Sequence, residues 1–130
     1  MNADVVRIAL AEWNAGRELT EEAFAEFARP DMVLDLTANV LNPGTFEGFE
    51  GFVRFADQVG EAWAEFRMEP DEIFERGDVV VALVRAVGTG QGSGVQIEAP
   101  VCVVCEMRSG RIARLRVEPD QEAALRAVGR

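Results

Sequence analysis

Hydrophobic residues recur at helical spacing in three segments of the first half of the chain. The first stripe consists of Val6, Ala9, Leu10 and Trp13, and Gly16 supplies a stop. A second, short helix begins after the cap Thr20, ends before Pro30 and carries an apolar face of Ala23, Phe24, Phe27 and Ala28. The clearest stripe comprises Phe52, Phe55, Ala56, Val59, Ala62, Trp63 and Phe66. These patterns predict three helices, of which the third is the longest.

Other apolar residues follow the two-residue alternation of β-strands. Residues 32–37 place Met32, Leu34 and Leu36 on one face and Val33, Asp35 and Thr37 on the other. Residues 39–48 have the composition of a loop. Strand patterns then occupy residues 66–74, 79–89, 95–108 and 111–118, and a short helix is predicted at 121–128. The turns between these last strands are short, which predicts antiparallel neighbours.

Helices at the start and a strand meander at the end predict an α+β fold, with three N-terminal helices packed on a curved antiparallel sheet. A chain of 130 residues fits a single domain, spanning 1–130. The strand at residues 79–87 is apolar on both faces, although a sheet with one solvated face would alternate. We therefore expect a homodimer that buries the outer face of the sheet.

Charge and composition narrow the range of partners. The formal net charge of −10 disfavours nucleic acid and anionic membrane surfaces. The longest purely apolar run, residues 79–84, is far shorter than the roughly 20 residues of a membrane-spanning helix. Charged residues interrupt any signal-peptide pattern in the first 20 residues, which predicts a cytoplasmic protein.

The chain contains no His, Tyr or Lys, and its thirteen basic residues are all Arg. Histidine bases, Schiff-base lysines and histidine-ligated metals are therefore excluded, and we expect neither a metal nor a cofactor. Acid–base chemistry would have to be carried by a carboxylate. Cys102 and Cys105 are three apart on a predicted strand, so they face opposite sides and are expected to be buried structural thiols.

Several short motifs, in order, resemble the SnoaL-like branch of the NTF2-like superfamily over nearly the whole chain. They include residues 13–16 (WNAG), 29–31 (RPD), 46–48 (FEG), 75–81 (ERGDVVV), 92–95 (GSGV), 108–112 (RSGRI) and 118–120 (EPD). The resemblance implies a cone-shaped α+β fold with a cavity at its wide end. It does not settle function, because this superfamily contains isomerases, hydrolases, cyclases and binding proteins.

Two catalytic patterns of the superfamily are absent. On the ketosteroid-isomerase pattern, Ala9, Leu36 and Val103 stand where the resemblance implies a tyrosine, a catalytic aspartate and a protonated acid. The epoxide-hydrolase pattern needs an Asp within residues 79–89, which hold none, and another near Val117, which is apolar. Neither mechanism is available to this sequence.

Asp35 is the candidate general base, because it lies mid-strand next to the position of the isomerase base. Desolvation in an apolar pocket would raise its pKa. Alternatively, it faces outward with Val33 and Thr37, or pairs with an Arg at a subunit contact. Arg85, on a buried strand, either clamps an anionic ligand or pairs with Asp35, Glu98 or Glu106.

Aromatic and apolar side chains on the helices and the sheet would form either a filled core or the wall of a pocket. They are Trp13, Phe24, Phe27, Phe55, Val59, Trp63, Val103, Cys105, Met107 and Val117, with Asn39 and Arg85 as polar partners. The first hypothesis is a non-catalytic binding module for a small apolar or aromatic metabolite. The second is a cofactor-independent isomerase, cyclase or lyase that uses Asp35, with Trp13 or Asn39 orienting the substrate. A third is a protein–protein module.

Overall fold

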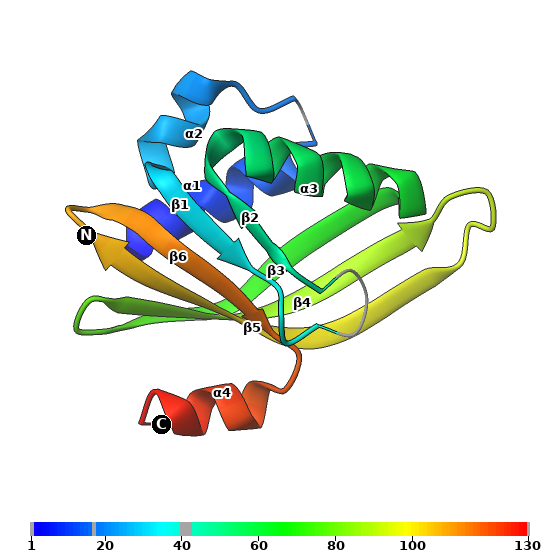
Figure 1. Ribbon diagram of the computed structural model, residues 1–130. Helices are drawn as coiled ribbons and strands as arrows, with labels where there is room; N and C mark the ends of the chain where they lie inside the picture. The colour runs from blue at the N-terminus through cyan, green and yellow to red at the C-terminus, as the bar shows by residue number, and fades with distance from the viewer. Residues whose placement is uncertain (1, 17, 40–42, 130) are drawn as a thin grey trace.

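Three helices cover one face of a six-stranded sheet, and a fourth lies against the opposite face, in the computed structural model of the chain (Figure 1). The structure describes residues 2–16, 18–39 and 43–129. Helices α1 (Asn2–Asn14), α2 (Glu21–Phe27) and α3 (Gly48–Ala62) lie on the inner face, and α4 (Gln121–Ala127) lies on the outer face. The predicted α+β class and the C-terminal helix are confirmed. No helix in the described ranges is long and apolar enough to cross a membrane.

The sheet has the strand order β2-β1-β6-β5-β4-β3. Its strands are β1 (Ala28–Asp35), β2 (Thr45–Glu47), β3 (Trp63–Arg76), β4 (Val79–Gly90), β5 (Gln96–Arg108) and β6 (Arg111–Glu118). All neighbours are antiparallel except β1 and β6, which are parallel. The prediction of a wholly antiparallel sheet is therefore wrong at this one pair. Short turns make consecutive strands antiparallel only from β3 to β6. The strands β1 and β6 are far apart in the sequence, so no short turn determines their relative direction.

The third helix ends earlier than its stripe of apolar residues suggests. Trp63 has extended backbone angles (φ −125°, ψ 128°) and begins β3, where Phe66 also lies. Both aromatic residues fit helical spacing, yet they are positioned by strand pairing, with Trp63 opposite Gly90 and Phe66 opposite Gly88. A periodicity of 3.6 residues thus continues by coincidence into a strand.

Two other boundaries differ from the predicted ones. β1 begins at Ala28, directly after α2, and a register shift between Ala28 and Val33 accommodates Pro30. β2 occupies part of the predicted loop, and its three residues are too few to show an alternation in the sequence. Thr20 does cap α2, because its hydroxyl accepts a hydrogen bond from the backbone N–H of Ala23.

The apolar residues form one cluster on each face of the sheet. The inner cluster joins α1, α2 and the sheet through residues such as Val6, Phe24 and Val84. The outer cluster centres on Val81, Cys102 and Val104, which are at most 1% exposed, and α4 packs against it. The two-sided apolar pattern of β4 is therefore satisfied within a single chain, and it does not by itself require a second copy. The homodimer stays a prediction.

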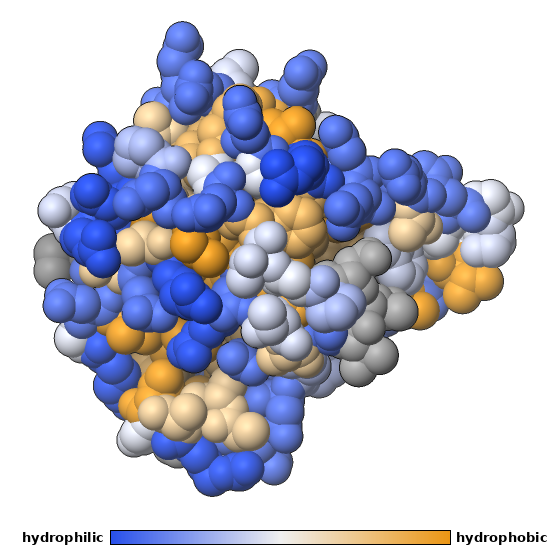
Figure 2. Space-filling model, in the orientation of Figure 1, coloured by the Kyte–Doolittle hydropathy of each residue, from blue (hydrophilic) through white to orange (hydrophobic). Residues whose placement is uncertain are grey.

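The hairpin of β4 and β5 extends past the helices at one end of the sheet (Figure 1). Val95 and Ile97 lie near its turn and are 60% and 45% exposed. Figure 2 shows hydrophobic surface at this end of the molecule. The inner face of the sheet is thus open at the end of the hairpin, beyond the reach of α3.

The two cysteines face opposite sides of β5, as the sequence predicts. Cys105 belongs to the inner cluster and Cys102 to the outer one, and both are free thiols with no exposed surface. Burial raises the pKa of Cys102 to about 11 and that of Cys105 to about 12. Neither thiol is therefore activated as a nucleophile.

Both thiols are expected to resist alkylation in the native protein. At pH 8 a rise in pKa from 9.0 to about 11 lowers the thiolate fraction about 100-fold, and burial adds a steric barrier. Labelling with iodoacetamide, followed by intact-mass measurement, should therefore find almost no adduct without urea and two adducts with it. Rapid labelling of the native chain would contradict this placement of the thiols.

Candidate functional site

A pocket of about 640 Å³ lies between the C-terminal half of α1, α3 and the first residues of β3. Its volume lies in the range of about 300–1,000 Å³ that small-molecule sites occupy. Six aromatic side chains contribute to its wall: Trp13, Phe27, Phe49, Phe52, Trp63 and Phe66. This is an aromatic-walled site on the helical side of the sheet.

The apolar face of α3 is only partly covered by the rest of the chain. All of α3 is described, and Gly51 is its only buried residue. Phe49, Phe52, Val53 and Val59 are half-buried and line the pocket. A helix with so strong an apolar stripe normally buries that stripe in the core. Here part of the stripe faces the pocket instead.

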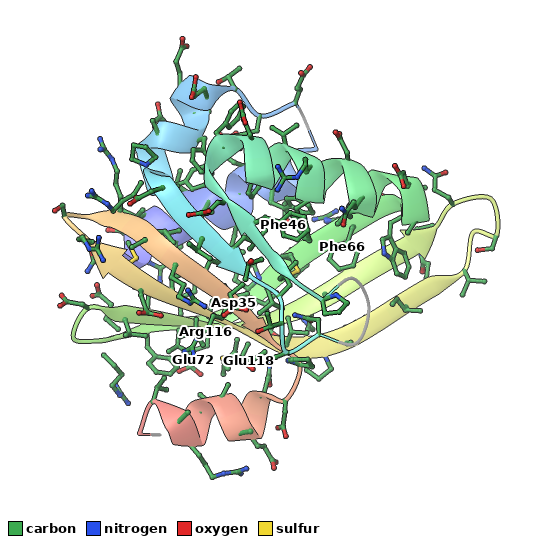
Figure 3. All side chains as sticks on the ribbon, in the orientation of Figure 1. Asp35, Phe46, Phe66, Glu72, Arg116 and Glu118 are labelled. Atoms are coloured by element: carbon green, nitrogen blue, oxygen red, sulfur yellow. The ribbon has the colours of Figure 1, made fainter. Side chains whose placement is uncertain are left out.

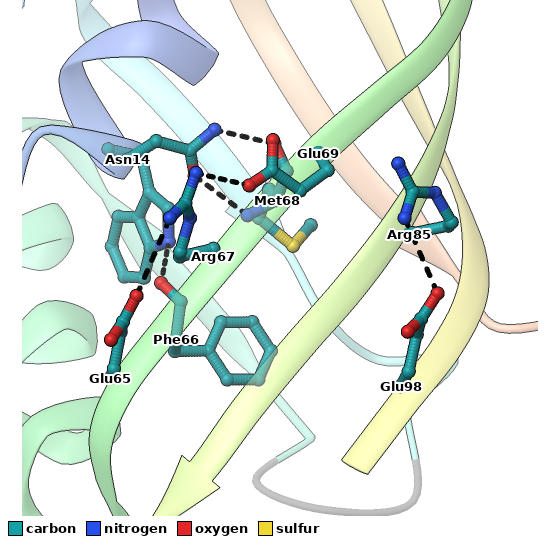
Figure 4. A network of polar contacts seen from close by, with 9 residues as sticks. Asn14, Glu65, Phe66, Arg67, Met68, Glu69, Arg85 and Glu98 are labelled. Carbon is teal, nitrogen blue, oxygen red and sulfur yellow. Dashed lines mark hydrogen bonds and ion pairs between the residues drawn. The ribbon is translucent and has the colours of Figure 1, made fainter. Parts of the chain in front are cut away.

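The end of α1 is fixed to the free edge of β3 by side-chain hydrogen bonds (Figure 4). The Asn14 amide donates to the carbonyl oxygen of Met68 (2.7 Å) and accepts from its N–H (2.7 Å), as a neighbouring strand would. The Trp13 indole Nε1–H donates to the carbonyl oxygen of Phe66 at 3.0 Å. These bonds cover an edge that would otherwise be unpaired. The bond to Phe66 also occupies the only side-chain donor of Trp13, so its ring acts as an apolar wall.

The second tryptophan of the pocket depends on a glycine in the neighbouring strand. A Cβ atom on Gly88 would lie 2.8 Å from Cε3 and Cζ3 of Trp63 and 3.3 Å from the ring of Phe66. The Trp63 and Phe66 rings also contact each other, with centroids 5.6 Å apart. The absence of a side chain at Gly88 therefore lets both rings lie against the sheet.

The predicted pocket residues divide into two groups. Trp13, Phe27, Val59 and Trp63 line the pocket. The residues outside this lining are Phe24, Phe55, Val103, Cys105, Met107 and Val117, which belong to the inner apolar cluster or pack against it. The sequence left open whether these residues wall a pocket or fill the core. In the structure, these six fill the core.

Asp35 lies on the outer face of β1, because its neighbours Leu34 and Leu36 both belong to the inner cluster. Figure 3 shows Phe46 and Phe66 on the side of α3, and Asp35, Arg116 and Glu118 toward α4. Asp35 is therefore separated from the aromatic pocket by the sheet. Of the two orientations that the sequence allowed for Asp35, the structure has the outward one, on the same face as Val33 and Thr37.

The carboxylate of Asp35 is held by three donors. Its Oδ1 accepts from the Thr37 hydroxyl (2.6 Å) and the Thr37 N–H (3.0 Å), and its Oδ2 accepts from Arg114 Nη2 (2.5 Å). The Thr37 hydrogen bonds, followed by the Arg114 guanidinium, lower the pKa of Asp35 from 3.8 to about 2, although burial opposes them. The expected rise in pKa is wrong, because these donors outweigh desolvation. Asp35 is a poor proton acceptor at neutral pH.

The two other polar candidates also lie outside the pocket. The half-exposed Arg85 pairs with Asp71 at 3.0 Å and with Glu98 at 3.5 Å, and these partners raise its pKa. Pairing rather than ligand binding is thus its arrangement, and Glu98 was one of the predicted partners. The Asn39 amide donates to the carbonyl oxygens of Val117 (3.0 Å) and Leu36 (3.3 Å), so it fixes the chain after β1.

Sequence reasoning missed the polar residues of the pocket. Glu12, Glu18, Asp57, Glu65 and Arg67 all line it. They come from α1, the segment before α2, α3 and β3, and a single sequence gives no sign that these segments meet. Only Asp57 carried a local signal, since it lies between Ala56 and Val59 on the helix with the clearest apolar stripe.

A comparison with models of known protein families identifies the family of the chain. The SnoaL-like domain matches residues 6–115. The chain belongs to the SnoaL-like family. Comparison of this SnoaL-like chain with curated protein sequences gives no match.

Solved structures confirm an NTF2-like fold for this SnoaL-like chain. TerC, co-crystallised with polyporic acid, has a TM-score of 0.78 and 20% identity, covering 99% of this chain and 98% of its own. A proposed SnoaL-like polyketide cyclase of Jannaschia sp. CCS1 has a TM-score of 0.76 and 19% identity, with coverages of 98% and 90%. A protein of Catenulispora acidiphila DSM 44928 with a ketosteroid-isomerase-like fold, in complex with trimethylamine, has a TM-score of 0.75 and 15% identity, with coverages of 97% and 92%. At these identities the likeness concerns the fold alone.

Proposed function

We propose that this SnoaL-like chain is a small-molecule-binding domain that holds an apolar or aromatic ligand in the pocket between α1, α3 and the start of β3. The observation that carries the proposal is the half-buried aromatic face of α3, which lines a cavity of about 640 Å³. A flat ligand in this pocket would cover apolar surface that the chain itself leaves exposed.

Two structures of the same fold give the proposal indirect support. TerC was crystallised with polyporic acid and the Catenulispora acidiphila protein with trimethylamine. The two compounds are different small molecules. The choice of ligand must therefore come from the residues of each pocket.

The geometry favours binding over catalysis by Asp35. A general base has to reach the proton that it removes, and Asp35 lies across the sheet from the pocket with its oxygens already bonded. We therefore do not assign it a catalytic role in this pocket. A homodimer and a cytoplasmic location remain predictions from the sequence.

Filling the pocket with a larger side chain should weaken ligand binding. Ala56 lines the pocket, whereas Gln58, two residues away on the same helix, is exposed and outside the lining. A neutral fluorescent probe, N-phenyl-1-naphthylamine, is expected to bind the unchanged protein saturably. Ala56→Phe should weaken this binding at least about tenfold, whereas Gln58→Phe should leave it unchanged.

Thermal unfolding monitored by circular dichroism would verify that both variants fold. Equal loss of binding in the two variants, or no loss in either, would place the probe elsewhere and refute the proposed site. An unchanged protein that does not bind the probe at all would argue against an apolar site.

A further inference from the structure

The rim of the aromatic pocket is strongly acidic. Four carboxylates line it: Glu12, Glu18, Asp57 and Glu65. Arg67 is the only basic residue among the described lining residues. The excess of negative charge at the pocket follows that of the whole chain, whose formal net charge is −10. Such a field attracts cations and repels anions.

The positive charge of Arg67 is already matched. Its guanidinium pairs with Glu65 at 3.7 Å and with Glu69 on the same strand (Figure 4). The side chains of Glu18 and Asp57 form no hydrogen bond or ion pair with another described residue. Glu18 precedes α2 and Asp57 lies on α3, so carboxylates without a partner in the described part of the chain reach the pocket from two elements. A bound anion would meet these carboxylates without a free basic partner among the described residues.

The aromatic wall has the same preference for positive charge. The faces of aromatic rings are electron-rich and attract ammonium groups, and tryptophan does so most strongly. Both tryptophans of the chain, Trp13 and Trp63, line the pocket and are half-buried. The Trp13 ring packs against Phe52, with centroids 5.9 Å apart. An apolar body could lie against these rings while its charged group faces the carboxylates.

We infer that the pocket selects a cationic ligand, namely an amine or quaternary ammonium compound with an aromatic or alkyl body. This inference rests on the proposed binding function and specifies the chemical class of the ligand. The aromatic wall alone would accept neutral and charged molecules of similar shape. The carboxylates at the rim supply the discrimination.

The test compares three compounds of similar size that differ in charge. They are phenyltrimethylammonium, its neutral isostere tert-butylbenzene, and the anion phenylacetate. Binding is read from intrinsic tryptophan fluorescence, which reports on this pocket alone because the chain has two tryptophans and no tyrosine. The cation is expected to bind about tenfold more tightly than the isostere at low salt. This advantage should shrink in about 0.5 M NaCl, whereas the affinity of the isostere should not fall.

Charge-neutralising variants locate the effect. Asp57→Asn and Glu18→Gln should each weaken binding of the cation several-fold and leave the isostere unchanged. Glu61→Gln is the matched control, because Glu61 lies one turn after Asp57, is exposed and does not line the pocket. It should change neither affinity.

Each outcome decides between the inference and the proposed function. Equal binding of the cation and the isostere, or tighter binding of phenylacetate, would overturn the inference of charge selection and leave the proposed binding function standing. If all three compounds leave the tryptophan fluorescence unchanged, both fail. Loss of cation binding in Glu61→Gln equal to that in Asp57→Asn would show a general effect of net charge and would likewise overturn the inference.

Discussion

Replacing Asp35 with Asn is expected to lower the free energy of unfolding by about 2 kcal/mol at pH 7. Asp35 is 8% exposed, and its carboxylate accepts hydrogen bonds from Thr37 and Arg114. Asparagine keeps the shape of the side chain but loses the charge. The expected loss corresponds to the lowering of the Asp35 pKa from 3.8 to about 2.

The effect of this substitution should depend on pH in a defined direction. Because the pKa is lower in the folded state, the stabilisation is complete well above pH 4 and is lost as the pH falls through about 2. Urea unfolding should therefore show a difference between the two proteins that is largest at pH 7 and about half as large at pH 3.

Asp31→Asn supplies the control for the Asp35 substitution. Asp31 lies on the same strand, but its side chain is 71% exposed and its contact with Arg29 measures 3.7 Å. Exposed ion pairs of this kind contribute little to stability. An Asp35→Asn variant no less stable than Asp31→Asn, or a loss that does not change with pH, would contradict the structural role assigned to Asp35.

The sequence predicts this network only in part. Alternation along residues 32–37 places Asp35 on the face opposite Leu34 and Leu36, which the structure confirms. The partner Arg114, however, comes from β6, and β1 reaches β6 through a parallel pairing that the short turns of the sheet do not reveal. The direction of the pKa shift depends on that partner and on Thr37, so it could not be predicted from burial alone.

The pocket residues, too, could be predicted only in part from the sequence. Helical spacing identified Trp13, Phe27 and Val59 as apolar positions, but it could not separate those that fill the core from those that wall a cavity. That distinction depends on where α3 ends and β3 begins. Trp63 and Phe66 pair with Gly90 and Gly88 of the neighbouring strand, and the missing side chain of Gly88, more than 20 residues further along the chain, leaves room for both rings. Local patterns predict elements better than the contacts between them.

Gly51→Ala and Gly60→Ala are expected to change stability in opposite directions, although both glycines lie within α3. Alanine is ordinarily the better helix former by about 1 kcal/mol. A Cβ at Gly51 would lie 2.8 Å from the carbonyl carbon of Phe46, whereas a Cβ at Gly60 has nothing within 4 Å. The first contact is with backbone and cannot be relieved by rotating a side chain.

Gly51→Ala should therefore lower the free energy of unfolding by about 1–3 kcal/mol, because α3 must move away from β2. Gly60→Ala should raise it by as much as about 1 kcal/mol. Urea unfolding of the two variants beside the unchanged protein measures both signs in one experiment. Two stabilised variants would mean that α3 does not pack closely against Phe46. Two destabilised variants would mean that the environment of Gly60 is more crowded than the structure indicates. Opposite signs would establish the close packing of α3 on β2, which fixes the helix that forms one wall of the pocket.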